Sequence, residues 1–543
     1  MSQQSLKNFV NELERAGQLV RIEEEKRVDQ LSKIMDSNPD KAVYVEKVKD
    51  CEFSFLANAY SNYDQYCLAL GCSKQEVGRK AAELSRGRIK PEIVTTSPCK
   101  DVILKGDDVD LTRFPLFLHH DRDGNAFIQD LCFISADPDT GVQDWGIYRS
   151  MYRSKNEMNI DMTCETHRCR INAMKNHHAG RNTPVSIVVG GPTIDKLALI
   201  ASVPNDTNDW EVLGSFYGAP AKMVKSETND LLVPANAEIV LEGEIITSEG
   251  WIHDEGPYGE ASGMYGGGLK HNCRVVISCM TFVKSGIYQH ATIGGRAAGK
   301  TDMASARPSL ESDIYASLKN AGIDVLEVRC EGVIGEVAYA KISTHAGGDA
   351  KQALGVMLTC SRQGVPKTAM VFDDDVDIWN DSEIQKAWAF RFMPAHDTFI
   401  IPDCNGIGID PSTGRDEPPY KTSKLGLDCT IPIGPGWRRD NFDWALAVDL
   451  GDPQANVTAM SEDEIAKDME TFITEQPRAW KEIIAHYLGQ PYPLVYRAFG
   501  RLRPRLGRAD DHPWYRYTFS GHEFAVEAAP AAKIHCAPHH PRV

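Results

Sequence analysis

Apolar residues near the N-terminus recur at helical spacing: Leu6, Phe9, Val10 and Leu13. Gly17 follows, and glycine commonly ends a helix, so the pattern predicts a helix over residues 6–16. Residues 19–22 are typical of a short strand. Residues 78–90 are basic and contain few large apolar side chains, which predicts an exposed helix or linker.

The segment from about 100 to 320 is rich in short apolar runs with β-like composition. The runs are residues 127–128, 131–134, 185–189, 237–245 and 273–279. Turn residues separate them, and this spacing predicts a barrel-like β domain with some helices.

From about residue 324 the pattern changes to alternating strands and helices. Residues 325–328 and 368–372 are strand candidates, and residues 351–361 and 383–392 are helix candidates, which indicates an α/β unit. The last segment, residues 491–543, contains an arginine run and an Ala/Pro/His-rich end, so we expect a partly loose extension. A chain of 543 residues is expected to form two or three domains.

The overall charge of −17 argues against nucleic acid or an anionic membrane as the main partner. No apolar run approaches the ~20 residues that span a bilayer, and the start has no signal-peptide core, so a cytoplasmic protein is expected. The 14 cysteines are scattered. Cys164, His167 and Cys169 are close in sequence, but no further ligands at zinc-finger spacing follow, so reduced thiols are expected.

Two carboxylates stand out in the segment 254–264, which reads DEGPYGEASGM. Glu255 and Glu260 are five residues apart, and the glycines and proline between them predict a rigid turn. Such a turn can hold both carboxylates near one point, where one carries a proton while the other stays ionised. Taken alone, the pattern also fits a solvated loop.

A second candidate segment, residues 144–152, places Arg149 in an apolar, strand-like run. A guanidinium in such a setting needs a carboxylate beside it, either from the protein or from a substrate.

Together with residues 226–235, 372–377 and 422–428, these two segments resemble the UbiD family over roughly residues 5 to 490. The family comprises carboxylases and decarboxylases that depend on prenylated FMN. The resemblance implies a multidomain α+β and α/β fold with a central split β-barrel that binds the flavin and a C-terminal α/β domain used in oligomerisation. The expected division is 1–110 (N-terminal α/β domain), 111–320 (barrel), 321–490 (C-terminal domain) and 491–543 (extension).

The resemblance also implies roles for three residues. Arg149 binds the substrate carboxylate and polarises the cofactor, Glu255 orients Arg149, and Glu260 donates the proton that replaces CO2. The implied activity is reversible, non-oxidative decarboxylation of an aromatic, heteroaromatic or conjugated acid. The alternative is a mainly structural subunit of a larger aromatic carboxylase, although the intact trio argues against it.

For the cofactor, the resemblance implies contacts from Ile147, Arg149 and Lys424, with Lys424 reaching the flavin phosphate. Without that resemblance Lys424 would be read as a solvated loop lysine. A divalent ion, Mn²⁺, Mg²⁺ or Fe²⁺, bridges the phosphate in the family, and K⁺ is expected as well.

The implied metal ligands are Asp144, His177 and Asp209, with His178 and Glu211 as alternatives. Asp144 and Asp209 depart from the family's Asn and Glu, but both remain hard oxygen ligands.

Other motifs are less specific. The acidic run 373–375 follows a strand and favours a structural role over a Mg²⁺ site. The glycine clusters 266–268 and 294–295 lack a phosphate-loop frame and are expected to be flexible loops.

Cationic residues near the second glycine cluster and in the C-terminal segment would suit an aryl-CoA substrate, although a subunit contact is the simpler reading of the arginine run. They are Arg296, Lys300, Arg501, Arg503, Arg505 and Arg508. The expected partners are therefore a small carboxylic acid or aryl-CoA, a flavin prenyltransferase that supplies the cofactor, and further copies of this chain.

Overall fold

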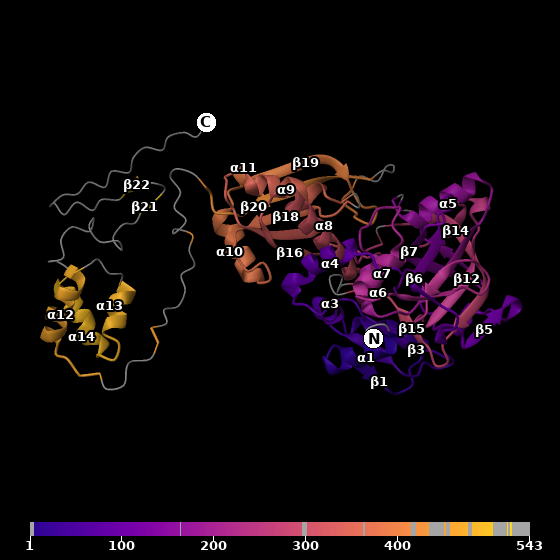
Figure 1. Ribbon diagram of the computed structural model, residues 1–543, viewed down its shortest axis with the longest axis horizontal. Coiled ribbons are helices and arrows are strands. Elements are labelled where there is room, and N and C mark those ends of the chain that lie inside the picture. The colour runs from indigo at the N-terminus through magenta and orange to yellow at the C-terminus, as the bar shows by residue number, and fades with distance from the viewer. Residues whose placement is uncertain are drawn as a thin grey trace. The chain divides into compact units, whose positions relative to one another are not determined.

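The computed structural model describes most of the chain (Figure 1). The described residues are 5–162, 164, 166–265, 267–295, 301–361, 364–413, 420–433, 442, 450–451, 457–475, 480–502, 518–519 and 522–523. Contacts divide the chain into two compact units, residues 1–430 and 431–543. This division lies well before residue 490, where the sequence suggested that an extension begins.

The N-terminal helix is α1 (Leu6–Arg15), and it buries the four apolar residues that predicted it. Gly17, at φ +70°, follows it, so the prediction for this helix is confirmed. The strands β1 (Leu19–Ile22), β2 (Ala42–Val45) and β3 (Ser54–Ala57) form the first part of a four-stranded sheet. Helices α2 (Leu31–Asp36) and α3 (Tyr63–Leu70) belong to the same region.

The fourth strand of this sheet comes from far along the chain. β15 (Ile287–His290) pairs in parallel with β3, with Ile287 opposite Ser54 and His290 opposite Ala57. The N-terminal sheet is therefore completed by a segment that follows the barrel in sequence.

Helix α4 (Val77–Arg86) corrects the prediction of an exposed segment over residues 78–90. The buried face of the helix consists largely of small residues, among them Gly78, Ala81 and Ala82. A Cβ on Gly78 would lie 2.9 Å from the Cβ of Glu311. The sparse large apolar side chains thus reflect close helix packing, and this face is not solvated.

Six strands close into an antiparallel barrel. The pairing runs β12–β9–β6–β7–β8–β14, and β14 returns to β12 to close the ring. The strands are β6 (Phe127–Ala136), β7 (Gln143–Ser154), β8 (Glu157–Ile160), β9 (Thr183–Val189), β12 (Ile239–Ile245) and β14 (Lys270–Phe282). The predicted barrel-like domain and split-barrel fold class are confirmed.

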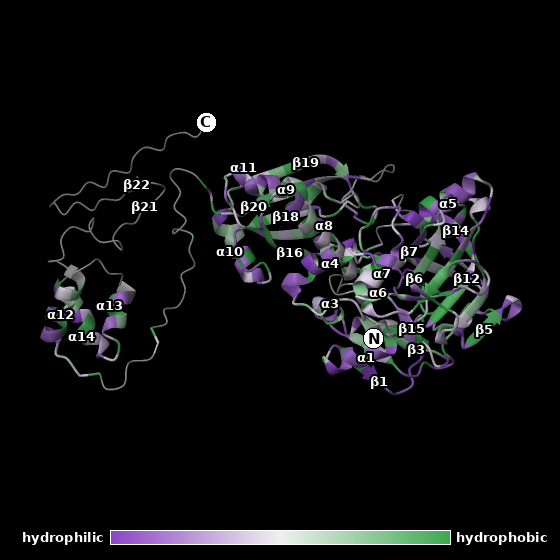
Figure 2. Ribbon diagram, in the orientation of Figure 1, coloured by the Kyte–Doolittle hydropathy of each residue, from purple (hydrophilic) through white to green (hydrophobic). Residues whose placement is uncertain are grey.

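Apolar side chains fill the barrel. Along β6 all residues but the last are buried, which fits a strand covered on both faces. Figure 2 shows the same hydrophobic character along β12. Closure removes the free edges that an open sheet of this length would present.

Shorter elements surround the barrel. β5 (Val102–Lys105) and β13 (His253–Glu255) pair with β14, and β4 (Glu92–Val94), β10 (Lys222–Lys225) and β11 (Leu232–Pro234) form a separate sheet. The helices of this region are α5 (Arg168–His178), α6 (Thr193–Leu199) and α7 (Asp209–Tyr217).

The C-terminal α/β unit predicted from residue 324 is confirmed. Its five-stranded sheet has the order β16–β17–β18–β20–β19, with parallel pairs at its centre. The strands are β16 (Val325–Glu331), β17 (Val337–Ile342), β18 (Thr368–Phe372), β19 (Thr398–Asn405) and β20 (Lys421–Asp428). The helices are α8 (Ala306–Asn320), α9 (Asp349–Thr359), α10 (Asp381–Arg391) and α11 (Pro394–Asp397).

The described residues of the second compact unit include the helices α12 (Glu462–Glu475), α13 (Trp480–His486) and α14 (Tyr492–Leu502), with the short strands β21 (Thr518–Phe519) and β22 (His522–Glu523). Val495, Ala498 and Leu502 of α14 are buried in a core with residues of α12 and α13. The first part of the predicted extension is therefore a packed helix. In the described parts of the chain, no helix has both the length and the apolar character to cross a bilayer.

Candidate active site

The two glutamates lie at the two ends of one turn. Glu255 is the last residue of β13, opposite Lys270 at the start of β14. Gly256 has φ +103°, which favours glycine, and the carbonyl of Pro257 accepts a hydrogen bond from the amide of Gly124 at 2.7 Å. The turn predicted from the glycines and proline is thus formed and tied to the segment before β6.

Arg149, on β7, joins both carboxylates. Its Nε donates to Glu255 Oε1 at 2.9 Å, and its Nη1 donates to Glu260 Oε2 at 3.0 Å. Nη2 also donates to Glu255 Oε2 at 3.3 Å, which makes the Glu255 contact bidentate. The side chain of Glu255 is fully buried and that of Glu260 is 4% exposed. The structure therefore brings together the three residues that the sequence predicted as a trio.

Two further charged residues belong to this cluster, and the sequence reading missed both. Asp161, which follows β8, has its Oδ2 2.9 Å from Nη2 of Arg149. Lys270 Nζ lies 3.1 Å from the same oxygen and 3.3 Å from Glu260 Oε1. A signal for Lys270 was present, because a hairpin that starts at the end of β13 sets a lysine opposite Glu255. Asp161 gave no such signal, since only the barrel pairing brings it to Arg149.

Two neutral residues hold this cluster. The ring centroid of Tyr258 is 4.1 Å from Cζ of Arg149, and its hydroxyl donates to Gln129 at 2.7 Å. Asn272 donates to Glu255 Oε2 at 3.3 Å. The guanidinium is therefore fixed by an aromatic face as well as by its carboxylates.

The Arg149 guanidinium stays protonated. Burial opposes a cation, but the carboxylates of Asp161, Glu260 and Glu255 raise the pKa of Arg149 well above its ordinary value. The site thus holds a permanent cation at which an anionic substrate group can bind.

The glycine clusters, expected to be flexible loops, include closely packed positions. A Cβ on Gly267 would lie 2.1 Å from Glu260 Oε1, and one on Gly294 would lie 2.7 Å from the carbonyl oxygen of Glu260. These glycines let the backbone approach Glu260 from two sides, so the loops at Gly267 and Gly294 pack closely against the turn. The glycine at 266 lies outside the described residues.

Asp123 ties the turn to the segment before β6, where three histidines lie nearby. The amides of His120 and Gly259 both donate to Asp123, at 2.9 and 2.8 Å. Burial lowers the pKa of His119 well below its ordinary value and that of His290 to about 3. Both rings are therefore neutral at physiological pH and do not serve as acids there.

The two carboxylates predicted as metal ligands lie together, but around an arginine. Arg168 Nε lies 2.8 Å from Asp144 Oδ1, and its Nη2 donates to Asp209. The second oxygen of Asp209 accepts the amide of Trp145 at 2.8 Å. Asp144 Oδ2 has no hydrogen-bond partner, and Asp144 is among the residues that line a cavity of about 30 Å³. Burial raises the pKa of Asp144 to about 7, although Arg168 opposes the shift.

The structure does not bring His177 to these carboxylates. Its Nδ1 contacts the carbonyl oxygen of Thr247 at 2.6 Å, and its ring packs against Trp251. The histidine beside Asp144 is His167: burial opposes its protonation, but Cys164 and the carboxylates of Asp161 and Asp144 raise its pKa. Among the described residues, no three His, Cys, Asp or Glu side chains form a group ready to hold a metal ion. Asp144 fits a cation through its unpartnered oxygen, whereas Asp209 would first have to release Arg168.

The proposed cofactor residues occupy two places. Ile147 is two residues before Arg149 on β7, so both side chains point to the same face of the strand. Lys424 is on β20, nearly fully buried, and its Nζ donates to the carbonyl of Leu358 at 2.7 Å. Burial lowers the pKa of Lys424. The reading of Lys424 as a solvated loop lysine is therefore excluded.

The remaining motifs have local roles or lie outside the described residues. Arg391 pairs with Asp375 at 2.6 Å and approaches Asp373 at 3.6 Å, as a structural acidic run would require. Arg501 pairs with Asp463 at 2.7 Å within the second unit. Residues 296–300 and 503–508, with the other cationic positions suggested for a CoA thioester, lie outside the described residues.

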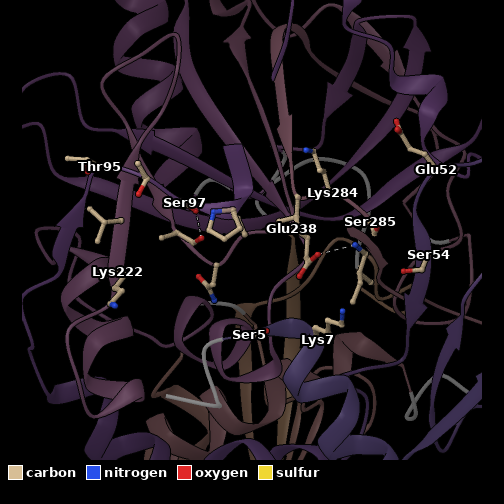
Figure 3. A pocket seen from close by; sticks show the side chains of 18 of the residues that line it. Ser5, Lys7, Glu52, Ser54, Thr95, Ser97, Lys222, Glu238, Lys284 and Ser285 are labelled. Carbon is tan, nitrogen blue, oxygen red and sulfur yellow. Dashed lines mark hydrogen bonds between the residues drawn. The ribbon is translucent and has the colours of Figure 1, made fainter. Parts of the chain in front are cut away.

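A cavity of about 1070 Å³, lined by both polar and apolar groups, includes residues 283–285, which follow the other end of β14. Figure 3 shows side chains of its lining. Lys7, Lys222, Glu238 and Lys284 are among its lining residues, and none of the predicted site residues is. The 13 residues of β14 extend about 40 Å at ~3.3 Å per residue, with Lys270 at one end and this cavity at the other. The cavity is thus separate from the cluster around Arg149.

Comparison with known proteins agrees with this architecture. Three domain signatures match the chain: the 3-octaprenyl-4-hydroxybenzoate carboxy-lyase N-terminal domain at residues 10–85, the Rift-related domain at 92–297 and the C-terminal domain at 306–429. The phenolic acid decarboxylase of Sedimentibacter hydroxybenzoicus is 27% identical over 453 residues, which cover 79% of this chain and 92% of that protein.

Two solved structures are similar in fold. The UbiD-class enzyme HmfF from Pelotomaculum thermopropionicum, in complex with FMN, has a TM-score of 0.74 at 24% identity and covers 81% of this chain and 97% of its own. The vanillic acid decarboxylase of Sedimentibacter hydroxybenzoicus, in its open form, has a TM-score of 0.70 at 25% identity. The match covers 87% of this chain and 99% of that protein's chain. Because its signatures match most of its length, this chain belongs to the UbiD family of decarboxylases.

Proposed function

We propose that this chain catalyses the reversible, non-oxidative decarboxylation of an aromatic, heteroaromatic or conjugated carboxylic acid with prenylated FMN. One observation carries the proposal: Arg149 is buried between Glu255 and Glu260, at 2.9 and 3.0 Å. A fixed cation beside two carboxylates supplies both a binding point for an anionic substrate and a group that can carry a proton.

Each member of the trio has a distinct task. Arg149 binds the carboxylate of the substrate, and Glu255 fixes the plane of the guanidinium through its bidentate contact. Glu260 bonds to one corner of Arg149 only, so it can turn toward the substrate and deliver a proton. Overall, the bond from the carbon to its carboxylate breaks, CO2 leaves, and the proton of Glu260 takes its place.

The cofactor residues follow from the same assignment. Ile147 and Arg149 would hold the flavin from β7, and Lys424 would release the Leu358 carbonyl to bind the flavin phosphate. Prenylated FMN, when bound, supplies the electron sink that the carbon needs when CO2 departs. For the divalent ion we propose Asp144 and Asp209, with His167 in place of His177; potassium has no assigned residues.

Phenolic acids are the proposed substrates, because relatives of this chain are named for that class. The proposed association is a homo-oligomer, and a flavin prenyltransferase supplies the cofactor. Assembly as a mainly structural subunit is disfavoured by the complete, buried trio.

The test uses protein produced together with a flavin prenyltransferase and assayed with vanillate and 3,4-dihydroxybenzoate. The wild-type protein should release CO2, and Glu260→Gln should lose activity by ~10²–10⁴-fold while retaining its flavin, since an amide cannot deliver the proton. Solvent-deuterium incorporation into the product provides a second readout.

Glu327→Gln is the matched control, because Glu327 also pairs with a lysine but lies on the C-terminal sheet. Near-normal turnover by Glu260→Gln would contradict the assignment of Glu260 as the proton donor. Equal activity with and without the prenyltransferase would remove the assigned cofactor.

A further inference from the structure

Lys270 is a second buried cation beside the proposed proton donor. Its Nζ lies 3.3 Å from Glu260 and 3.1 Å from Asp161, and its side chain is only 16% exposed. Asp161 in turn lies 2.9 Å from Arg149. The proposed reaction gives no task to Lys270 or to Asp161, although both touch residues that have one.

The charges of this cluster do not balance once a substrate arrives. Three carboxylates and two cations, all at most 16% exposed, leave one net negative charge when every group is ionised. An anionic substrate adds a second negative charge. Because like charges repel strongly where water is largely excluded, the loaded cluster favours uptake of one proton.

Among the carboxylates, Glu260 is the one best placed to take that proton. Glu255 is held by two bonds from Arg149 and one from Asn272, all of which require an acceptor. Glu260 receives a single bond from Arg149. The groups that face it are Arg149 from β7 and Lys270 from β14, with Tyr258 in its own turn and Asp161 behind Lys270.

In the free protein, Lys270 opposes the protonation of Glu260. An ammonium group at 3.3 Å favours the ionised carboxylate, and Asp161 holds that ammonium in place. Gly267 packs against both partners: a Cβ there would meet Glu260 Oε1 at 2.1 Å and Lys270 Cε at 3.2 Å. The pair is thus confined as well as charged.

We propose that Lys270 and Asp161 are positioning residues that keep Glu260 ionised in the free enzyme and make substrate binding depend on the uptake of one proton by Glu260. This inference rests on the proposed function. The proton comes from solvent, passes from Glu260 to the carbon as the bond to CO2 breaks, and leaves Glu260 ionised beside Lys270 again. Charge and atoms balance in each turnover.

Calorimetry tests the coupling without turnover. Benzoate is titrated into FMN-loaded protein at neutral pH in two buffers of different ionisation enthalpy, which counts the protons taken up. Wild-type protein should take up close to one proton per benzoate. Lys270→Met should take up close to none, because Glu260 already holds its proton there, while Asp161 and Glu255 stay paired with Arg149. Lys270→Arg should restore the uptake. Lys341→Met is the control, since Lys341 is 17% exposed and pairs with Glu327 at 3.2 Å on another sheet.

The pH dependence of kcat/KM for vanillate provides the second test. Loss of a neighbouring cation should move the alkaline limb upward by ~1–3 pH units in Lys270→Met. Asp161→Asn removes an anion and should move the limb downward. Opposite shifts distinguish the proposal from a merely structural role, which lowers activity without moving the limb.

Unchanged proton uptake and an unchanged limb in Lys270→Met would overturn the inference, as would wild-type protein that fails to bind benzoate. If Lys270→Met does not fold, the test rests on Asp161→Asn. A downward shift of its alkaline limb supports the inference, and an unchanged or upward-shifted limb overturns it. The proposed function fails separately: wild-type protein that takes up a proton with benzoate but decarboxylates no acid retains the coupling and loses the activity.

Discussion

Gly267→Ala is a perturbation that separates the position of Glu260 from its chemistry. The substitution removes no charged group and adds one methyl group beside the carboxylate. Because Gly267 does not have the positive φ that disfavours side chains, alanine is compatible with its backbone.

The size of the effect follows from the geometry. The new Cβ would lie 2.1 Å from Glu260 Oε1, whereas unbonded atoms attract best at ~3.5–4.0 Å, so the carboxylate must retreat by more than ~1 Å. A misplacement of ~1 Å in a reacting group costs ~10²-fold in rate. The oxygen is the far end of a side chain and can move, so the free energy of unfolding should change by less than ~1 kcal/mol.

The assay measures kcat and KM for vanillate with flavin-loaded protein, alongside urea unfolding. Gly348→Ala is the matched control, because a Cβ there meets no atom within 4 Å. We expect Gly267→Ala to lose kcat with an unchanged unfolding midpoint. Wild-type kcat in this variant would refute the reasoning that Glu260 must stay where Gly267 allows it.

Two further predictions concern stability. Lys196→Met should lower the free energy of unfolding by ~3–5 kcal/mol in urea titrations, because it leaves Asp130, 2.8 Å away in the native protein, as an unpaired buried charge; a loss below ~1 kcal/mol would contradict this. Burial raises the pKa of Glu311 to about 8, so the native state keeps a proton that the unfolded chain loses above its own pKa of ~4.5. Its contribution to stability is therefore complete below pH ~4.5 and declines by ~1.4 kcal/mol per pH unit up to about pH 8. Glu311→Gln should flatten this decline in unfolding experiments across pH 5 to 8, and an unchanged slope would show that other groups cause it.

The sequence predicted those parts of the fold that local patterns encode. The helix of residues 6–16 and the alternating elements after residue 324 follow from spacing alone, and the structure confirms them. Helix α4 was misread because Gly78 and its small neighbours pack against another helix, and composition alone cannot distinguish such a face from a solvated one.

The candidate site was only partly predictable for a related reason. Glu255 and Glu260 share one turn, so their proximity is local, and motif resemblance identified Arg149 as their partner. Asp161 and Lys270 reach Arg149 and Glu260 through the pairing of β7, β8 and β14, which depends on barrel closure. His177 was chosen from sequence position, with His178 as its alternative, whereas the histidine beside Asp144 is His167, at the other end of helix α5.

The late arrival of β15 has a consequence for how the chain folds. β3 ends at Ala57, and its parallel partner begins at Ile287, so 229 residues separate the two strands. During synthesis the edge of β3 stays open until the whole barrel has emerged, and an open strand edge invites pairing with other chains. Contacts over such a distance also slow folding. The N-terminal region therefore depends on the barrel for its own completion, and expressed alone as residues 1–110 it should aggregate.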